Sequence, residues 1–148
     1  MIKIYTIGFT QKNAKHFFEL LKGVQIERLI DVRVNNSSQL AGFAKGRDLE
    51  YFCKEILDCE YLHFTDLAPT KELLKSYSDK KIAWTDYEKI FNSLLQTRDI
   101  SKRHDISIFD NACLLCSEAA PEQCHRRLVA EFLKRKNPDK KIEILHLI

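Results

Sequence analysis

The chain has 148 residues, of which 45% are hydrophobic and 30% charged, with a formal net charge of +3. This composition excludes a disordered chain, and the mild basic excess falls short of the clustered charge of a dedicated nucleic-acid binder. It permits an anionic substrate. The length suits one domain that folds without a disulfide or a structural metal.

The cysteine content indicates a reducing compartment. The five cysteines are Cys53, Cys59, Cys113, Cys116 and Cys124. Their number is odd, and Met1–Phe9 is too short and too broken for a secretory signal or a membrane span. We therefore expect free thiols, a cytoplasmic protein and no membrane partner.

Hydrophobic patterning predicts the regular elements in chain order. Apolar runs predict strands at Lys3–Phe9, Arg28–Val32, Tyr61–Phe64, Ala112–Cys116 and Lys141–Leu147. Helical periodicity predicts helices at Ala14–Lys22, Asp48–Leu57, Pro69–Tyr77, Trp84–Thr97 and from Pro121 to about Arg135. Asn13 is the expected N-cap and Gly23 the expected stop of the first helix. Ile106–Phe109 fits an extra strand or the end of a connection.

The alternation of strands and helices predicts the fold class. We expect a single α/β domain over residues 1–148, with a mostly parallel, five-stranded, Rossmann-like sheet flanked by helices. A 3-2-1-4-5 order follows if the long connection after the third strand crosses to the far side of the first. Ligands of such sheets bind at the carboxyl ends of the strands, at the switch point. The connection, residues 65–111, is predicted to be a helical insertion that caps the site, or equally two helices that only pack on the sheet.

Chemically capable side chains gather in ACLLCSEAAPEQCHRR, residues Ala112–Arg127. Cys116 and Glu118 follow the fourth strand, and Cys124 and His125 are predicted in the first turn of the last helix. Unpaired N–H groups and the helix dipole favour a thiolate there. We predict these four residues to be catalytic and leave open which cysteine reacts. The alternative is that Cys124 and His125 are core residues and Glu118 a charge at the helix start.

Five further residues are predicted to bind the ligand: Gly8, Phe9, Asp31, Arg33 and Arg126. The first four lie at strand ends, and Arg126 is expected beside the apolar stripe of the last helix. Arginine suits anion binding through charge-assisted hydrogen bonds. A purely structural ion pair between Asp31 and Arg33 is equally open.

The spacing of Cys113, Cys116, Cys124 and His125 is similar to a zinc pattern. Residues three apart on a strand point to opposite faces, so Cys113 and Cys116 cannot share a metal. A site made of Cys116, Cys124 and His125 is the remaining alternative. We predict no bound metal and no cofactor.

Four motifs carry a family resemblance. They are TIGF at Thr6–Phe9, DVR at Asp31–Arg33, LLCSE at Leu114–Glu118 and CHR at Cys124–Arg126. In this order they resemble the DUF488 family of uncharacterised proteins, over nearly the whole chain. The family commonly has a histidine where this chain has Phe9. The resemblance implies the fold and the clustering of these motifs, and it implies no reaction.

Three functions follow from these patterns. The leading hypothesis is an enzyme that binds a phosphorylated or other small anion, a nucleotide or a nucleic-acid end. The second is a non-catalytic module that binds nucleic acid or protein. The basic run Lys134–Lys141 is the ordinary pattern of a solvated helix end, with nucleic-acid contact as the alternative. The third is a rhodanese-like sulfur carrier, because DVR also occurs at a strand end in rhodanese-like domains. Trp84, Tyr87 and Phe91 have the spacing of core residues on a helix.

Overall fold

A parallel sheet organises the fold, seen in a computed structural model that describes residues 1–37 and 42–148. Its strands are β1 (Ile2–Gly8), β2 (Arg28–Asp31), β3 (Glu60–His63), β4 (Ala112–Cys116) and β5 (Ile142–Leu147). Their order is β3-β2-β4-β1-β5, and every pairing is parallel. The predicted α/β class is confirmed, and each predicted strand matches within one residue at either end. Residues 38–41 of the loop after β2 lie outside the described residues.

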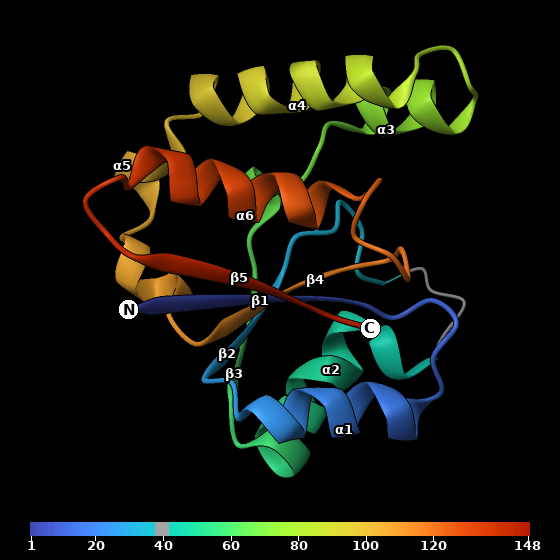
Figure 1. Ribbon diagram of the computed structural model, residues 1–148. Coiled ribbons are helices and arrows are strands. Elements are labelled where there is room, and N and C mark those ends of the chain that lie inside the picture. Colours follow the sequence, from blue (N-terminus) through green and yellow to red (C-terminus); the bar gives the residue numbers. More distant parts are fainter. Residues whose placement is uncertain (38–41) are drawn as a thin grey trace.

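Helices cover both faces of this sheet (Figure 1). They are α1 (Ala14–Val24), α2 (Gly46–Phe52), α3 (Lys71–Ser78), α4 (Trp84–Thr97), α5 (Ile100–Arg103) and α6 (His125–Lys136). Short 3₁₀ turns lie at Gly42–Ala44, Thr65–Leu67 and Ile106–Phe109, and a π-helical turn at Cys53–Leu57 continues α2. The helices α1 and α2 lie on one face, while α6 lies on the other with α4 packed on its outer side (Figure 1). Ile106–Phe109 forms one of the 3₁₀ turns and is not an extra strand.

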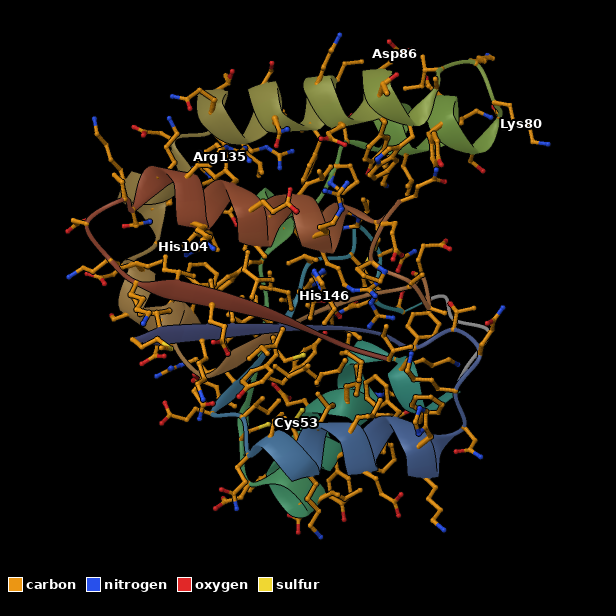
Figure 2. The ribbon with its side chains drawn as sticks, in the orientation of Figure 1. Cys53, Lys80, Asp86, His104, Arg135 and His146 are labelled. Atoms are coloured by element: carbon orange, nitrogen blue, oxygen red, sulfur yellow. The ribbon has the colours of Figure 1, made fainter. Side chains whose placement is uncertain are left out.

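Side chains from alternate strand positions fill two separate cores. Phe17 and Leu21 of α1 pack on one face of the sheet, and Leu128 and Phe132 of α6 pack on the other. Figure 2 shows both layers, with Cys53 on the α1 side and His146 on the α6 side. The residues of β4 alternate between the two faces: Cys113 and Leu115 face α1, whereas Leu114 and Cys116 face α6. The predicted opposition of Cys113 and Cys116 is confirmed.

The strand order differs from the expected 3-2-1-4-5. The connection after β3 returns to the centre of the sheet, so β4 lies between β2 and β1. All five residues of β4 are buried, whereas β5 carries Glu143 and His146 and lies at an edge. Apolar strands need cover on both faces and both edges, which favours β4 at the centre. The site consequently forms at the ends of β4 and β2.

Two helix boundaries also differ from expectation. The Asn13 cap is confirmed, because its Oδ1 accepts a hydrogen bond from the His16 N–H at 2.8 Å. Gly23 does not stop α1, which continues to Val24 and ends at Gln25 in the left-handed conformation. The helix α6 starts at His125, not at Pro121, and the extended residue Cys124 is its N-cap.

The described helices include none with the length and apolar character of a membrane span. Within the connection between β3 and β4, Arg98 Nη1 donates to the carbonyl oxygens of Asp66 and Ala68 at 2.7 and 2.6 Å, which holds the end of α4 to the turn that follows β3. Its role as a cap stays a prediction.

Candidate functional site at the ends of β2 and β4

A cleft of about 640 Å³ opens at the carboxyl ends of β2 and β4. One wall follows the strands, and the opposite wall comes from α3 and the start of α4. The lining residues are Arg33, Val34, Asn35, Cys116, Ser117, Glu118, Gln123 and His125 on the first wall, and Lys71, Leu74, Lys75, Tyr77, Ser78, Asp79, Trp84 and Tyr87 on the second. Four predicted site residues therefore line one cleft: Cys116, Glu118, His125 and Arg33.

Cys116 and His125 form the floor of this cleft. The Cys116 Sγ lies 3.5 Å from both Nδ1 and Nε2 of His125. His125 Nε2 lies 2.6 Å from the Val32 carbonyl oxygen. Because a carbonyl only accepts, Nε2 carries the hydrogen, which leaves Nδ1 of the neutral ring as a proton acceptor.

Cys124 completes a buried cluster with these two residues. The Sγ atoms of both cysteines and the ligand nitrogen of His125 all lie within 4.8 Å of one another. Burial alone would raise the pKa of Cys116. Hydrogen bonds from the Cys124 thiol and the Ser117 N–H, together with the charge of Arg126, outweigh the effect of burial and hold this pKa below its ordinary value. The same hydrogen bond, together with burial, raises the pKa of Cys124. Within the pair, this hydrogen bond therefore favours the thiolate on Cys116 and the thiol on Cys124.

Asp31 and Arg33 form a buried bidentate ion pair. Arg33 Nε and Nη2 donate to Asp31 Oδ1 and Oδ2 at 2.9 and 2.7 Å, and the side chains are 3% and 0% exposed. Tyr61 Oη adds a hydrogen bond of 2.6 Å to Asp31 Oδ2, and Arg33 Nη2 donates to the Ala44 carbonyl at 2.6 Å. These contacts fix the guanidinium plane at the edge of the cleft.

One nitrogen of the Arg33 guanidinium, Nη1, takes no part in these contacts. Burial opposes the charge of Arg33, but the hydrogen bond and charge of Asp31 outweigh burial and raise its pKa. Arg33 Nη1 is buried and has no hydrogen-bond partner among the described residues. A buried donor without a partner is costly, so this nitrogen is suited to an anion that enters the cleft.

Arg126 lies elsewhere than expected. It is fully buried and does not line the cleft, so its predicted place beside the apolar stripe is wrong. Its Nη1 and Nη2 donate to the carbonyl oxygens of Glu118 and Ala119 at 2.5 and 3.4 Å. Arg126 thus holds the loop that follows Cys116. Its role in ligand binding stays a prediction.

Gly8 and Phe9 contact residues of the site but do not line the cleft. A Cβ at Gly8 would lie 1.6 Å from the Glu118 carbonyl oxygen, so only glycine allows this approach of β1 to the loop. Phe9 is buried, and its ring centroid lies 5.3 Å from Cζ of Arg33, a cation–π distance. The loop is further held by Thr10, whose N–H and Oγ1 both donate to the Ser117 carbonyl.

The second wall contains residues that sequence reasoning missed. Lys71, Lys75 and Tyr77 of α3 and Trp84 of α4 all line the cleft. Tyr77 Oη donates to Gln123 Oε1 at 3.0 Å and so joins α3 to the loop before α6. Helical spacing predicts that Trp84 is a core residue, and it does stack on Tyr87, with ring centroids 4.8 Å apart. Trp84 is nevertheless half-buried and lines the cleft, which helical spacing alone does not reveal.

Comparison with known proteins tests the family resemblance. The family described as "Domain of unknown function DUF488" matches residues 13–133. The chain belongs to the DUF488 family. The matched segment includes the DVR, LLCSE and CHR motifs, and TIGF lies just before it. No curated protein and no solved structure matches the chain. The DUF488 description states no function, so the functional argument depends on the geometry of the cleft.

Cys116, Cys124 and His125 are also the residue types that bind zinc. A metal ion needs the imidazole nitrogen lone pair, which lies in the ring plane, to point at the ion. Because the Val32 carbonyl holds Nε2–H, Nδ1 is the His125 nitrogen left for a metal ion, and it lies 3.5 Å from the Cys116 sulfur. The absence of a bound metal stays a prediction.

Proposed function

We propose that this DUF488 protein is a thiol-dependent enzyme in which Cys116 attacks an electrophilic centre of an anionic ligand. One observation carries the proposal: the Cys116 sulfur lines a cleft and lies 3.5 Å from Nδ1 of His125, an imidazole whose Nε2–H is held by the Val32 carbonyl. A nucleophile, a base and a group that orients the base are the three parts of such a site.

Each residue of the cluster has a role in this proposal. Cys116 is the nucleophile, and the hydrogen bonds from Cys124 and the Ser117 N–H stabilise its thiolate. His125 accepts or returns a proton at Nδ1. Glu118 is exposed at the cleft wall, where its carboxylate can exchange protons with bound ligand.

The cationic groups of the cleft support an anionic ligand. Arg33 lines the cleft and has a buried Nη1 without a partner among the described residues, while Lys71 and Lys75 line the opposite wall from α3. Inorganic phosphate and phosphorylated small molecules are ligands that arginine and lysine bind in this way.

Alkylation with iodoacetamide, followed residue by residue with peptide mass mapping, tests the nucleophile. We expect Cys116 to react with a pH midpoint below the ordinary thiol value of about 8.5. Cys124→Ala should move this midpoint upward, because it removes a hydrogen bond that favours the thiolate.

Cys113 is the matched internal control for this experiment. It lies on the same strand but on the opposite face, and burial raises its pKa. Cys113 should stay unmodified in the folded protein throughout. If Cys116 reacts no faster than Cys113 at neutral pH, the proposed nucleophile is wrong.

Protection by inorganic phosphate tests the anion subsite. Phosphate should slow the alkylation of Cys116, and Lys71→Ala should weaken that protection about two- to fivefold, the effect of one exposed charge. Lys89→Ala is the control, because Lys89 is exposed on α4 outside the cleft. Equal protection in wild type, Lys71→Ala and Lys89→Ala would argue against a contribution of Lys71.

The two alternative functions predict different outcomes. A binding module would show unreactive thiols and steeply salt-dependent binding of DNA or RNA. A sulfur carrier would carry a persulfide on Cys116 when isolated. Mass mapping and salt titration of the same preparation separate these outcomes from the proposed enzyme.

A further inference from the structure

We infer that Cys124 is the resolving thiol of this site and that the ligand class is a small, anionic compound with a reducible disulfide bond. This inference rests on the proposed role of Cys116 as nucleophile. It adds a second reacting residue and names the bond that is broken.

The position of the two thiols relative to the cleft sets the order in which they react. Both residues are buried, at 5% and 3% exposed, but Cys116 lines the cleft and Cys124 does not. A ligand in the cleft therefore meets Cys116 first. The Cys124 Sγ lies behind it, within 4.8 Å of both the Cys116 Sγ and the His125 ligand nitrogen.

A second thiol at this distance is informative about the chemistry. An acyl or phosphoryl group on a cysteine can be removed by water, and a nucleophile of that type needs no neighbouring thiol. A mixed disulfide is released by attack of another thiol. Cys124 is in position to supply that thiol, and the anionic subsite at Arg33 Nη1 favours ligands that carry carboxylate or phosphate groups.

The reaction balances as two exchanges. In the first, the Cys116 thiolate attacks one sulfur of R–S–S–R, the S–S bond breaks, R–S⁻ leaves, and R–S–S–Cys116 forms. In the second, Cys124 gives its proton to His125 Nδ1 and attacks the Cys116 sulfur. The Cys116–Cys124 bond forms, the second R–S⁻ leaves, and His125 returns the proton to a product thiolate.

The electrons balance with one external reductant. The two protein thiols are oxidised to a disulfide, and the ligand disulfide is reduced to two thiols. A small dithiol such as dithiothreitol then reduces the Cys116–Cys124 disulfide and restores the starting state.

Formation of the Cys116–Cys124 bond needs the two sulfurs to approach to about 2.05 Å. This approach requires a rotation of the side chain of Cys124, the N-cap of α6.

Cys53 and Cys59 provide an internal comparison. Their thiols are also hydrogen bonded to each other: Cys53 begins the π-helical turn, and Cys59 follows Asp58, the cap at its end. They lie on the α1 side of the sheet, away from the cleft and from His125. Glutathione disulfide should therefore oxidise the Cys116–Cys124 pair faster than the Cys53–Cys59 pair.

The test uses glutathione disulfide with wild type and Cys124→Ser. Serine is a preferred N-cap residue, so α6 should keep its start in this variant, which circular dichroism checks. In wild type we expect a Cys116–Cys124 disulfide and two released glutathione thiols per protein. In Cys124→Ser we expect glutathione to remain on Cys116, with one thiol released.

Three results would overturn the inference. The first is a stable mixed disulfide on wild-type Cys116, and the second is equal thiol release by wild type and Cys124→Ser. The third is one equivalent of added zinc that binds tightly and protects both thiols, which would make the cluster a metal site.

If Cys116 alkylates as proposed but no intramolecular disulfide forms, only this inference fails. If Cys116 is inert to both reagents, the proposed function fails with it.

Discussion

Replacing Asp31 with alanine is expected to lower the free energy of unfolding by about 3–5 kcal/mol. The substitution leaves the guanidinium of Arg33, which is 3% exposed, without its bidentate partner. It also removes the acceptor of the Tyr61 hydroxyl. Urea denaturation measures this loss as a lower transition midpoint at an unchanged slope.

The exposed pair Lys75–Asp79 is the control for the Asp31 substitution. Its atoms are 3.3 Å apart, and its side chains are 76% and 41% exposed. Asp79→Ala should change the free energy of unfolding by less than about 1 kcal/mol. A loss of that small size for Asp31→Ala would show that the Asp31–Arg33 pair does not hold the end of β2.

Gly8→Ala is expected to destabilise the fold by about 3 kcal/mol, the upper end of the usual range for overpacking. The added Cβ would meet the Glu118 backbone carbonyl, which cannot move aside as a flexible side chain does. Because Glu118 follows Cys116 by two residues, the same change should also displace the loop and slow the alkylation of Cys116. Thermal unfolding and the alkylation rate measure the two effects.

Gly23→Ala is the matched control for Gly8→Ala. Gly23 lies within α1, and a Cβ there would meet nothing within 4 Å. Alanine favours the helix over glycine, so this change should stabilise the protein by up to about 1 kcal/mol. If Gly8→Ala and Gly23→Ala change the free energy of unfolding equally, the close approach of β1 to the loop does not matter for stability.

Local patterns were sufficient to predict the strands and part of the site. The run Ala112–Cys116 is apolar and short, and this pattern determines a buried strand wherever the strand lies in the sheet. The two-residue period of a strand then placed Cys113 and Cys116 on opposite faces. DVR and LLCSE end neighbouring parallel strands, so Arg33 and Cys116 reach the same edge of the sheet.

Features that depend on distant contacts were not predicted. The position of β4 between β2 and β1 depends on where a long connection returns, which no local pattern specifies. Pro121 suits the first turn of a helix, but the loop before α6 is instead held by Arg126, so the helix starts at His125. Arg126, Val129, Ala130 and Leu133 share one helix face, and that spacing could have indicated that Arg126 is buried.

Ultraviolet titration of thiolate absorbance tests the central claim most directly, that Cys116 is a thiolate at the floor of the cleft. The difference between wild type and Cys116→Ser removes the contribution of Cys59, whose hydrogen bond with Cys53 also lowers its pKa. The account predicts one additional thiolate in wild type at neutral pH, lost on acidification with a midpoint below about 8.5. Equal thiolate absorbance of the two proteins at neutral pH would contradict it.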